Sequence, residues 1–302
     1  YSALNKGCGI EGMCYFVEDI KDSELIELGT TSNGIKIYEA KNPVKGNTAN
    51  QSQKQINENY ENYTGMFQYE DSKKGQTPMS FENFAKAHPL IYWKDGFGRW
   101  SAMVGNDFKP MAECGKPVIY LYPEKTTDVN VKVKIDQFTQ TIPSYNPQSG
   151  WTVKAQPNGQ IYNYADGKNY PYLFWEGIKK ETVGTDKGFV IAKENLESFL
   201  NESLTKMGLN QNEQKDFKEF WLPRMQQNSN PYFFISFMGT TAFNKVAPLE
   251  ITPKPDTLIR VFMYYQPLNT PFKVQPQNLN TIPRKGFTAI EWGGTSSEPW
   301  QY

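Results

Sequence analysis

The second half of the chain alternates apolar and polar residues in a way typical of β-strands. From Asp128 to Asp136 every second residue is apolar, beginning with Val129. Side chains two apart share one face of a strand, so this segment is predicted to be a strand with one buried and one wet face. Short apolar segments continue to residue 176, separated by Asn158-Gly159 and Asp166-Gly167, which favour tight turns.

The region 194–227 instead follows a helical period. Its first part has an apolar stripe from Leu196 to Met207 and stops at Gly208. Asn210 with Glu213 three residues later is a capping-box signature for a second helix. We therefore expect a helical insertion over 194–227, with Pro223 kinking or ending its second helix. Strands are expected to resume at 232–238, 258–265 and 287–292.

The N-terminal third mixes helix and strand signals. Ser80 is placed to cap a short helix over 81–88, and apolar segments at 90–94 and 99–104 flank a glycine-containing turn, which predicts a hairpin. Residues 42–75 are polar and show no sustained helical period. We expect a polar loop with one amphipathic helix there; a mobile flap is the less favoured alternative.

These elements predict the fold class. The 302 residues allow about two domains, and an aromatic content of 15% favours sheets over a helix bundle. We predict a mostly β α+β protein with a smaller N-terminal α+β domain over 1–112. Residues 113–302 are expected to form an antiparallel, immunoglobulin-like β-sandwich with the helix pair packed against it.

The charge and residue counts exclude several classes of function. The 32 Lys and Arg residues balance 32 Asp and Glu residues, so nucleic acid is a poor candidate partner. His88 is the single histidine, which removes zinc sites that need two imidazoles. The sequence contains no Asp-x-Asp-x-Asp-Gly loop and no Cys-x-x-Cys. We expect no metal, no cofactor and, with no run of about 18 apolar residues, no transmembrane segment in this chain.

The N-terminal sequence bears on location. The chain starts with Tyr1 instead of Met, which we interpret as processing of an exported protein. We therefore expect an extracellular or cell-surface location. Cys8 and Cys14 are separated by a glycine-containing segment that would allow a local disulfide. Pairing of either one with Cys114, or three reduced thiols, remains open.

Five motifs along the chain carry a resemblance to a family. The sequence resembles an uncharacterised family of hypothetical proteins over about two thirds of its length. The resemblance implies that residues 113–294 fold together, and it implies no reaction, substrate or catalytic residue. The motifs are CGKPVIYLYPE at 114–124, YLFWEG at 172–177, WLPR at 221–224, PKPDTLIRVF at 253–262 and EWGG at 291–294.

Two glutamates are candidates for catalysis. Glu176 follows Trp175, and Glu291 precedes Trp292, each at the end of an apolar segment. Glycosidases use two carboxyl groups as acid and as base or nucleophile, and aromatic faces stack on sugar rings. The alternative is that each glutamate accepts hydrogen bonds within the fold while its tryptophan packs in the core.

Cys114 and Lys116 offer other chemistry. The ammonium of Lys116 would lower the pKa of a Cys114 thiolate, with His88 or a carboxylate as the base. The alternative is a buried or disulfide-bonded cysteine. Lys116 could also form an isopeptide cross-link with an Asn or Asp side chain, although the motif is not specific. We expect Arg260, within an otherwise apolar strand, to pair with one of the motif glutamates.

The aromatic residues suggest a binding function. Tyr120, Tyr122, Trp175 and Trp292 could stack on a surface glycan, with Arg260 and Lys116 nearby, although the spacing of the two tyrosines favours packing between layers. Our leading hypothesis is a structural or adhesive module at the cell surface that acts by binding or self-assembly. Its partners would be a surface glycan or another copy of the chain. The alternative is a carbohydrate-active hydrolase that uses Glu176 and Glu291.

Overall fold

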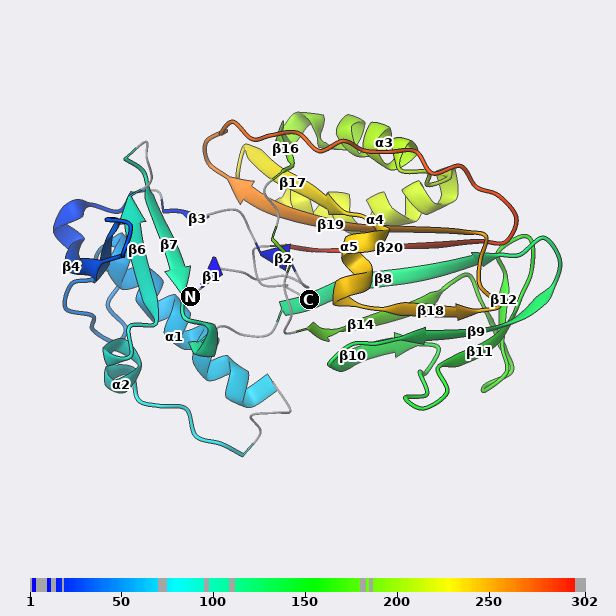
Figure 1. Ribbon diagram of the computed structural model, residues 1–302, viewed down its shortest axis with the longest axis horizontal. Helices are drawn as coiled ribbons and strands as arrows, with labels where there is room; N and C mark the ends of the chain where they lie inside the picture. The colour runs from blue at the N-terminus through cyan, green and yellow to red at the C-terminus, as the bar shows by residue number, and fades with distance from the viewer. Residues whose placement is uncertain are drawn as a thin grey trace. The chain divides into compact units, whose positions relative to one another are not determined.

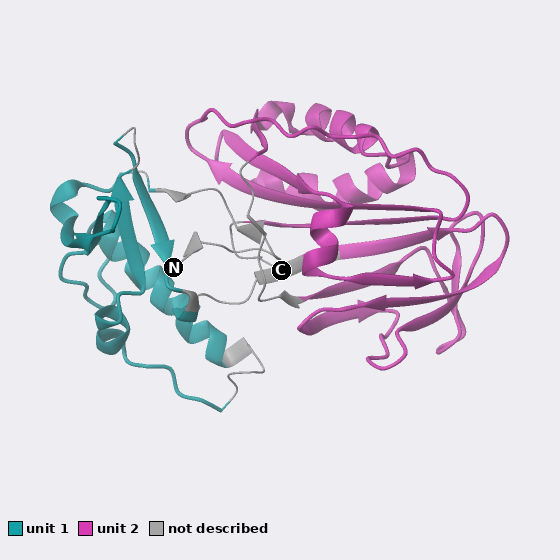
Figure 2. Cartoon of the chain, in the orientation of Figure 1, with its two compact units in different colours: residues 1–5, 11–111 teal, residues 6–10, 112–302 magenta. Residues whose placement is uncertain are grey.

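The computed structural model describes residues 2–3, 10–11, 15–17, 19–69, 75–94, 98–108, 112–179, 183–184 and 187–296. By their contacts these residues group into two compact units, shown in Figure 2. Unit 1 comprises residues 1–5 and 11–111, and unit 2 comprises residues 6–10 and 112–302. Strands outnumber helices in the described part, in antiparallel and mixed sheets, which confirms the prediction of a mostly β α+β protein.

Unit 1 is built on one antiparallel sheet. Its strand order is β1-β7-β6-β5-β4, and β3 also pairs with β7. The hairpin predicted around residue 97 is formed by β6 and β7, with Tyr92 opposite Ala102. The strands are β1 (Ser2–Ala3), β3 (Tyr15–Phe16), β4 (Leu25–Thr30), β5 (Lys36–Ala40), β6 (Leu90–Lys94) and β7 (Trp100–Val104).

Two α-helices accompany this sheet, α1 (Gln51–Tyr69) and α2 (Phe81–Lys86). Ser80 caps α2 as predicted, accepting a hydrogen bond from the backbone N–H of Asn83. The two helices share an aromatic cluster in which Tyr63 and Phe84 pack with ring centroids 5.1 Å apart. Short 3-10 turns lie at η1 (Asp22–Glu24) and η3 (Asn106–Phe108).

Helix α1 is the one helix expected within the polar segment 42–75, and it fills more of that segment than a mainly irregular loop would. Besides the apolar Ile56, Tyr63 and Met66, it buries amide side chains. Gln53 donates to the carbonyl oxygens of Lys41 and Asn42 at 2.8 and 3.0 Å. Asn57 donates to those of Val44 and Asn47 at 2.9 and 3.0 Å. The amides satisfy the backbone of residues 41–47, which is why these polar side chains can be buried beside the apolar cluster of the helix.

The larger sheet of unit 2 has seven strands in the order β10-β14-β8-β20-β19-β17-β16. Neighbours are antiparallel except β19 and β20, which run parallel, so the expected wholly antiparallel arrangement is wrong at this pair. The strands are β8 (Ala112–Tyr122), β10 (Gln137–Ile142), β14 (Leu173–Lys179), β16 (Phe189–Ala192), β17 (Tyr232–Met238), β19 (Thr257–Leu268) and β20 (Thr288–Ser296).

A second sheet of unit 2 is antiparallel, with the order β13-β12-β11-β9-β18. The alternation predicted from Asp128 is present in β9, where Val129, Val131 and Val133 are buried and the residues between them are not. The strands are β9 (Thr127–Val133), β11 (Trp151–Ala155), β12 (Ile161–Asn163), β13 (Lys168–Tyr170) and β18 (Leu249–Thr252). The short strands β2 (Ile10–Glu11) and β15 (Val183–Gly184) form a separate pair.

Two helices cover one face of the seven-stranded sheet (Figure 1). They are α3 (Leu196–Lys206), preceded by the turn η4 (Lys193–Asn195), and α4 (Gln211–Gln227). The capping box of Asn210 and Glu213 begins α4 as predicted. The helix continues past Pro223 for four residues, so this proline does not end it.

The opposite face of the seven-stranded sheet packs on a helix that the sequence did not predict, α5 (Thr240–Val246), and on the smaller sheet. Trp175 stacks on Phe243 of α5 with ring centroids 6.4 Å apart. It also contacts Phe138, which contacts Tyr145, and Tyr145 in turn packs on Trp151 of β11 at 4.7 Å. These aromatic contacts link the two sheets. The face of β9, β11 and β12 on the Trp151 side is therefore the inner face, and the opposite face of these strands points outward.

Candidate functional site

Arg260 and Glu291 form a buried ion pair in unit 2. They are register partners on the parallel strands β19 and β20, and both side chains are fully buried. The guanidinium donates to one carboxylate oxygen of Glu291, and the indole N–H of Trp175 donates to the other at 2.9 Å. Arg260 also donates to Asn244 and to the carbonyl oxygen of Ala247. The pairing expected of Arg260 with a motif glutamate is therefore present.

This burial corrects the prediction that Glu176 and Glu291 act as a catalytic pair. Both oxygens of Glu291 accept hydrogen bonds in the core, where no substrate can reach them. Glu176 lies in β14 and is partly exposed. A glycosidase needs both carboxyl groups beside the scissile bond. The geometry gives Glu291 a structural role. The hypothesis of a hydrolase that uses Glu176 and Glu291 therefore lacks its second catalytic carboxyl group.

The two tryptophans beside these glutamates are also core residues. Trp175 and Trp292 are both fully buried. Trp292 packs against Phe217 of α4 at 5.3 Å, on the helix-covered face of the sheet, while Trp175 packs against α5 on the other face. Neither indole has a face free for a sugar ring, so the structure corrects the binding role expected of both.

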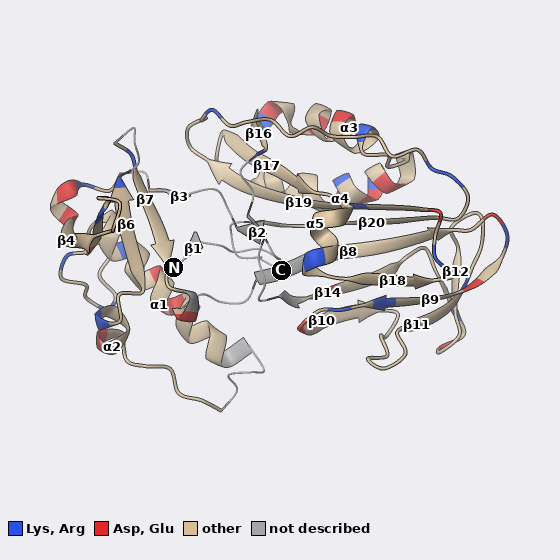
Figure 3. Ribbon diagram, viewed as in Figure 1, with Lys and Arg blue, Asp and Glu red and all other residues tan. Residues whose placement is uncertain are grey.

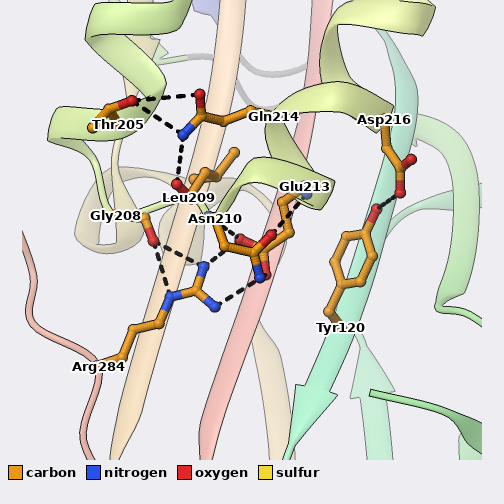
Figure 4. A network of polar contacts seen from close by, with 9 residues as sticks. All are labelled: Tyr120, Thr205, Gly208, Leu209, Asn210, Glu213, Gln214, Asp216 and Arg284. Atoms are coloured by element: carbon orange, nitrogen blue, oxygen red, sulfur yellow. Dashed lines mark hydrogen bonds and ion pairs between the residues drawn. The ribbon is translucent and has the colours of Figure 1, made fainter. Parts of the chain in front are cut away.

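Tyr120 and Tyr122 of β8 lie under the N-terminal half of α4. Their rings are parallel with centroids 6.2 Å apart, and the hydroxyl of Tyr120 donates to Asp216 at 2.7 Å (Figure 4). Burial, reinforced by the Asp216 carboxylate, raises the pKa of Tyr120 far above its usual value. Burial likewise raises the pKa of Tyr122. These tyrosines pack between layers, as their spacing favours, and do not form an open platform.

Arg284 completes this polar layer from the segment between β19 and β20. Figure 4 shows its guanidinium bound to Glu213 and to the carbonyl oxygen of Gly208, the latter at 2.8 and 3.0 Å. Glu213 is buried and also accepts from the backbone N–H of Asn210 at 2.8 Å. The capping box was visible in the sequence, but Arg284 was not, because 71 residues separate it from Glu213. The contact fastens this segment to the turn between α3 and α4.

Several predicted residues lie outside the part that the structure describes. Cys8 and Cys14 fall there, as do the side chains of Cys114 and Lys116 in β8. The local disulfide, the reactive thiol and the isopeptide remain predictions. His88, in unit 1, binds Glu39 through Nδ1 at 2.6 Å.

The outward side of β9, β11 and β12 carries polar and aromatic side chains. We call it the outer sheet face and define it by six residues. Along these strands the inward residues are buried, and the outward residues are partly or fully exposed. The six residues are Asp128, Asn130, Thr152, Lys154, Tyr162 and Tyr164.

Tyr164 is the central residue of the outer sheet face. It is 44% exposed, and its backbone N–H donates to the carbonyl oxygen of Thr152 on β11 at 3.3 Å. Its hydroxyl donates to Asp128 on β9, two strands away from β12. Two strand spacings amount to about 10 Å, a span that the side chain bridges by extending across β11. The hydrogen bond to Asp128 raises the pKa of Tyr164.

Neighbouring side chains surround this ring. Tyr162 meets Tyr164 edge-on, with ring centroids 5.7 Å apart and an interplanar angle of 87°. The ammonium of Lys154 lies 5.7 Å from the centroid of Tyr164. In the strand register Lys154 stands between Asp128 and Tyr162. The face therefore combines a broad aromatic surface, an aromatic edge, a cation and a carboxylate within a few ångströms.

The sequence contains a signal for these two tyrosines. Tyr162 and Tyr164 are two residues apart, so in an extended segment they share a face, and Ile161 and Asn163 face the other way. What the pattern could not show is which face of β12 meets the core. The exposure of Tyr164 follows from the packing of Ile161 and Asn163 inward.

Comparison of the chain with family models, curated proteins and solved structures finds no match in any of the three. Among the described residues no group of three or more His, Cys, Asp or Glu side chains could hold a metal ion. No helix in the same residues has the length and apolar character needed to cross a bilayer.

Proposed function

We propose that the protein is an extracellular or cell-surface module that acts by binding, and that the outer sheet face is its contact surface. The observation that carries this proposal is the state of Tyr164. Its ring is tied at the hydroxyl to Asp128, and it is still 44% exposed. An aromatic side chain fixed in this way loses little conformational entropy on binding, and aromatic residues dominate binding energy in many interfaces.

Binding is favoured over catalysis by the positions of the candidate acids. Glu291 is fully buried and neutralised by Arg260. On the outer sheet face Asp128 accepts a hydrogen bond from Tyr164, which occupies it in positioning the ring. An arrangement that holds an aromatic surface still is suited to recognition.

Two further features belong to the same proposal. We interpret the paired sheets of unit 2 as an immunoglobulin-like sandwich, in which one sheet packs inward and leaves an open outer face for a partner. The parallel pair β19–β20 is a departure from that fold. Self-association is the second mode of action that we propose, with another copy of the chain as the partner.

Binding to fixed cells tests the contact surface. The full chain, labelled with a fluorophore, is added to a panel of fixed microbial and animal cells and measured by flow cytometry. We expect bound fluorescence to fall at least about tenfold in Tyr164→Ala. Ile142→Ala is the matched control, because Ile142 is 45% exposed on β10 of the other sheet. Equal binding by both variants, or no binding by the native chain, would refute the outer sheet face as a contact surface.

Light scattering tests the proposed self-association, and cell fractionation tests the proposed extracellular or cell-surface location. A concentration-dependent rise in mass that Tyr164→Ala leaves unchanged would place self-association elsewhere on the molecule. Recovery of the native protein with the cytoplasmic fraction would contradict the proposed location.

A further inference from the structure

We infer that the ligand of the outer sheet face is a neutral glycan, with one pyranose ring stacked on Tyr164. This inference rests on the proposed function and names the ligand class for the same face. It follows from three properties of the face: the orientation of its aromatic rings, the kinds of polar group around them, and its balance of charge.

The first property is the orientation of the rings. Because the side chain of Tyr164, the residue after β12, reaches past β11 to Asp128 on β9, its ring lies across the outer sheet face and is 44% exposed. The exposed side can receive the C–H face of a pyranose, which is flat and apolar. Tyr162, at 87° to this ring, borders the same space with an aromatic wall. A flat surface with one wall limits the direction in which a sugar ring can lie.

The second property is the pairing of a donor with an acceptor beside the ring. Lys154 provides ammonium donors over the Tyr164 ring, 5.7 Å from its centroid, and the second carboxylate oxygen of Asp128 provides an acceptor, since the first accepts from the Tyr164 hydroxyl. A sugar hydroxyl both donates and accepts, so neighbouring hydroxyls of one ring can use both groups. Charged hydrogen bonds of this kind are stronger than neutral ones.

The third property is the charge balance. The outer sheet face carries one acid and one base, Asp128 and Lys154. Beside it, Lys132 of β9 is partly exposed, and Glu250 of β18 pairs with Lys134. Figure 3 shows blue and red residues interspersed over unit 2, without a stripe of one sign along these strands. Polyanions such as nucleic acids and sulfated glycans bind through clustered cations that displace counterions. The face lacks such a cluster in its described residues and so suits an uncharged ligand.

The apolar content of the face favours a glycan over another copy of the chain as the ligand bound there. Protein interfaces have an extended, well-packed apolar core. Of the large apolar side chains that are described as exposed, Tyr164 alone belongs to the outer sheet face. One aromatic ring is enough to stack a single sugar residue, and it is a small core for a protein interface.

Affinity gel electrophoresis tests the inference with the full native chain. Native gels are cast with dextran, galactomannan or xyloglucan as neutral polymers, and with heparin as the charged comparison. We expect at least one neutral polymer to retard the protein and heparin to have no effect. In that gel Tyr164→Ala should raise the apparent dissociation constant at least about tenfold. Tyr164→Phe, which keeps the ring and loses its tie to Asp128, should raise it about threefold.

The variants separate failure of the ligand class from failure of the contact surface. If no neutral polymer retards the native protein while Tyr164→Ala still loses binding to cells, the ligand class is wrong and the contact surface stands. If heparin retards the protein and the neutral polymers do not, the ligand is anionic and the inference is overturned. If neutral polymers retard Tyr164→Ala and Ile142→Ala as strongly as the native chain, the glycan binds elsewhere. Thermal unfolding of each variant checks that it is folded.

Discussion

Arg260 and Glu291 face each other as register partners on adjacent parallel strands, inside the core of unit 2. The aromatic ring of Phe243 lies 4.1 Å from the guanidinium, and Trp175 donates to the carboxylate. Two charges removed from water are stabilised by their mutual attraction and by hydrogen bonds to neighbouring groups. This pair therefore makes the packing of β19, β20, β14 and α5 depend on one another.

Removal of the carboxylate charge should destabilise unit 2. In Glu291→Gln the guanidinium of Arg260 stays buried without a counter-charge, and we expect the free energy of unfolding to fall by about 3–5 kcal/mol. Urea unfolding followed by tryptophan fluorescence measures this loss. The control is Glu250→Gln, which breaks an exposed ion pair with Lys134 and should cost less than about 1 kcal/mol. Equal losses in the two variants would contradict the structural role of Glu291.

The contact of Arg284 with Glu213 should hold the segment between β19 and β20. Arg284→Met removes the cation from a buried carboxylate and from the carbonyl oxygen of Gly208, so we expect a loss of about 1–3 kcal/mol. Cleavage by a non-specific protease within residues 269–286 should become faster. Lys218→Met is the control, since Lys218 binds Glu197 and Asn201 at the surface between α3 and α4. Unchanged cleavage in Arg284→Met would show that other contacts hold the segment.

Stability should fall at alkaline pH because of the buried tyrosine of β8. Burial raises the pKa of Tyr120 above its unfolded value, which is about 10. Above pH 10 the unfolded chain releases this proton while the folded chain keeps it. The stabilisation is thus complete below pH 10 and is lost as the pH rises further. In Tyr120→Phe the free energy of unfolding should fall less steeply between pH 10 and 11 than in the native chain. If the pH dependence were the same in both proteins, the loss of stability would come from other groups.

The amide of Asn57 should be essential for the loop that precedes α1. Asn57→Leu removes the side-chain donor to the carbonyl oxygens of Val44 and Asn47 and the acceptor of the Gly46 N–H, although Val44 keeps the backbone N–H of Asn47. We expect a loss of about 2–3 kcal/mol. Hydrogen exchange of residues 41–47 should accelerate in parallel. Glu58→Ala, one residue along and exposed, should change stability by less than about 0.5 kcal/mol. If Asn57→Leu left the free energy of unfolding and the hydrogen exchange unchanged, water would have replaced the hydrogen bonds of the amide.

Part of the fold could be read from local patterns, and those parts share a physical basis. The alternation at Val129, Val131 and Val133, the hairpin of β6 and β7 and the capping box of Asn210 each depend on residues within a few positions of one another. Helix α1 shows the limit, because the sequence predicted one amphipathic helix in the segment 42–75 but not which of its polar residues are buried. Its buried amides look like solvent-exposed residues until their partners in residues 41–47 are known.

The candidate site was harder to predict because exposure is not a local property. The sequence allowed Trp175, Trp292 and Tyr120 either a binding role or a core role, and all three are buried. Tyr164, which is exposed, carried the same alternation signal as its neighbour Tyr162. An aromatic strand residue is a core residue or a binding residue according to which side of its strand meets another layer.

The sequence by itself determined the mostly β composition, the local strand and helix signals and the absence of a strong net charge. The tertiary structure alone decided that Glu291 faces Arg260 in the core, that β19 and β20 run parallel, and that Tyr164 extends toward Asp128 on an open face. The reason is that strand periodicity specifies two faces without naming the inner one. Only the packing of one layer on another, driven by burial of apolar surface, makes that choice.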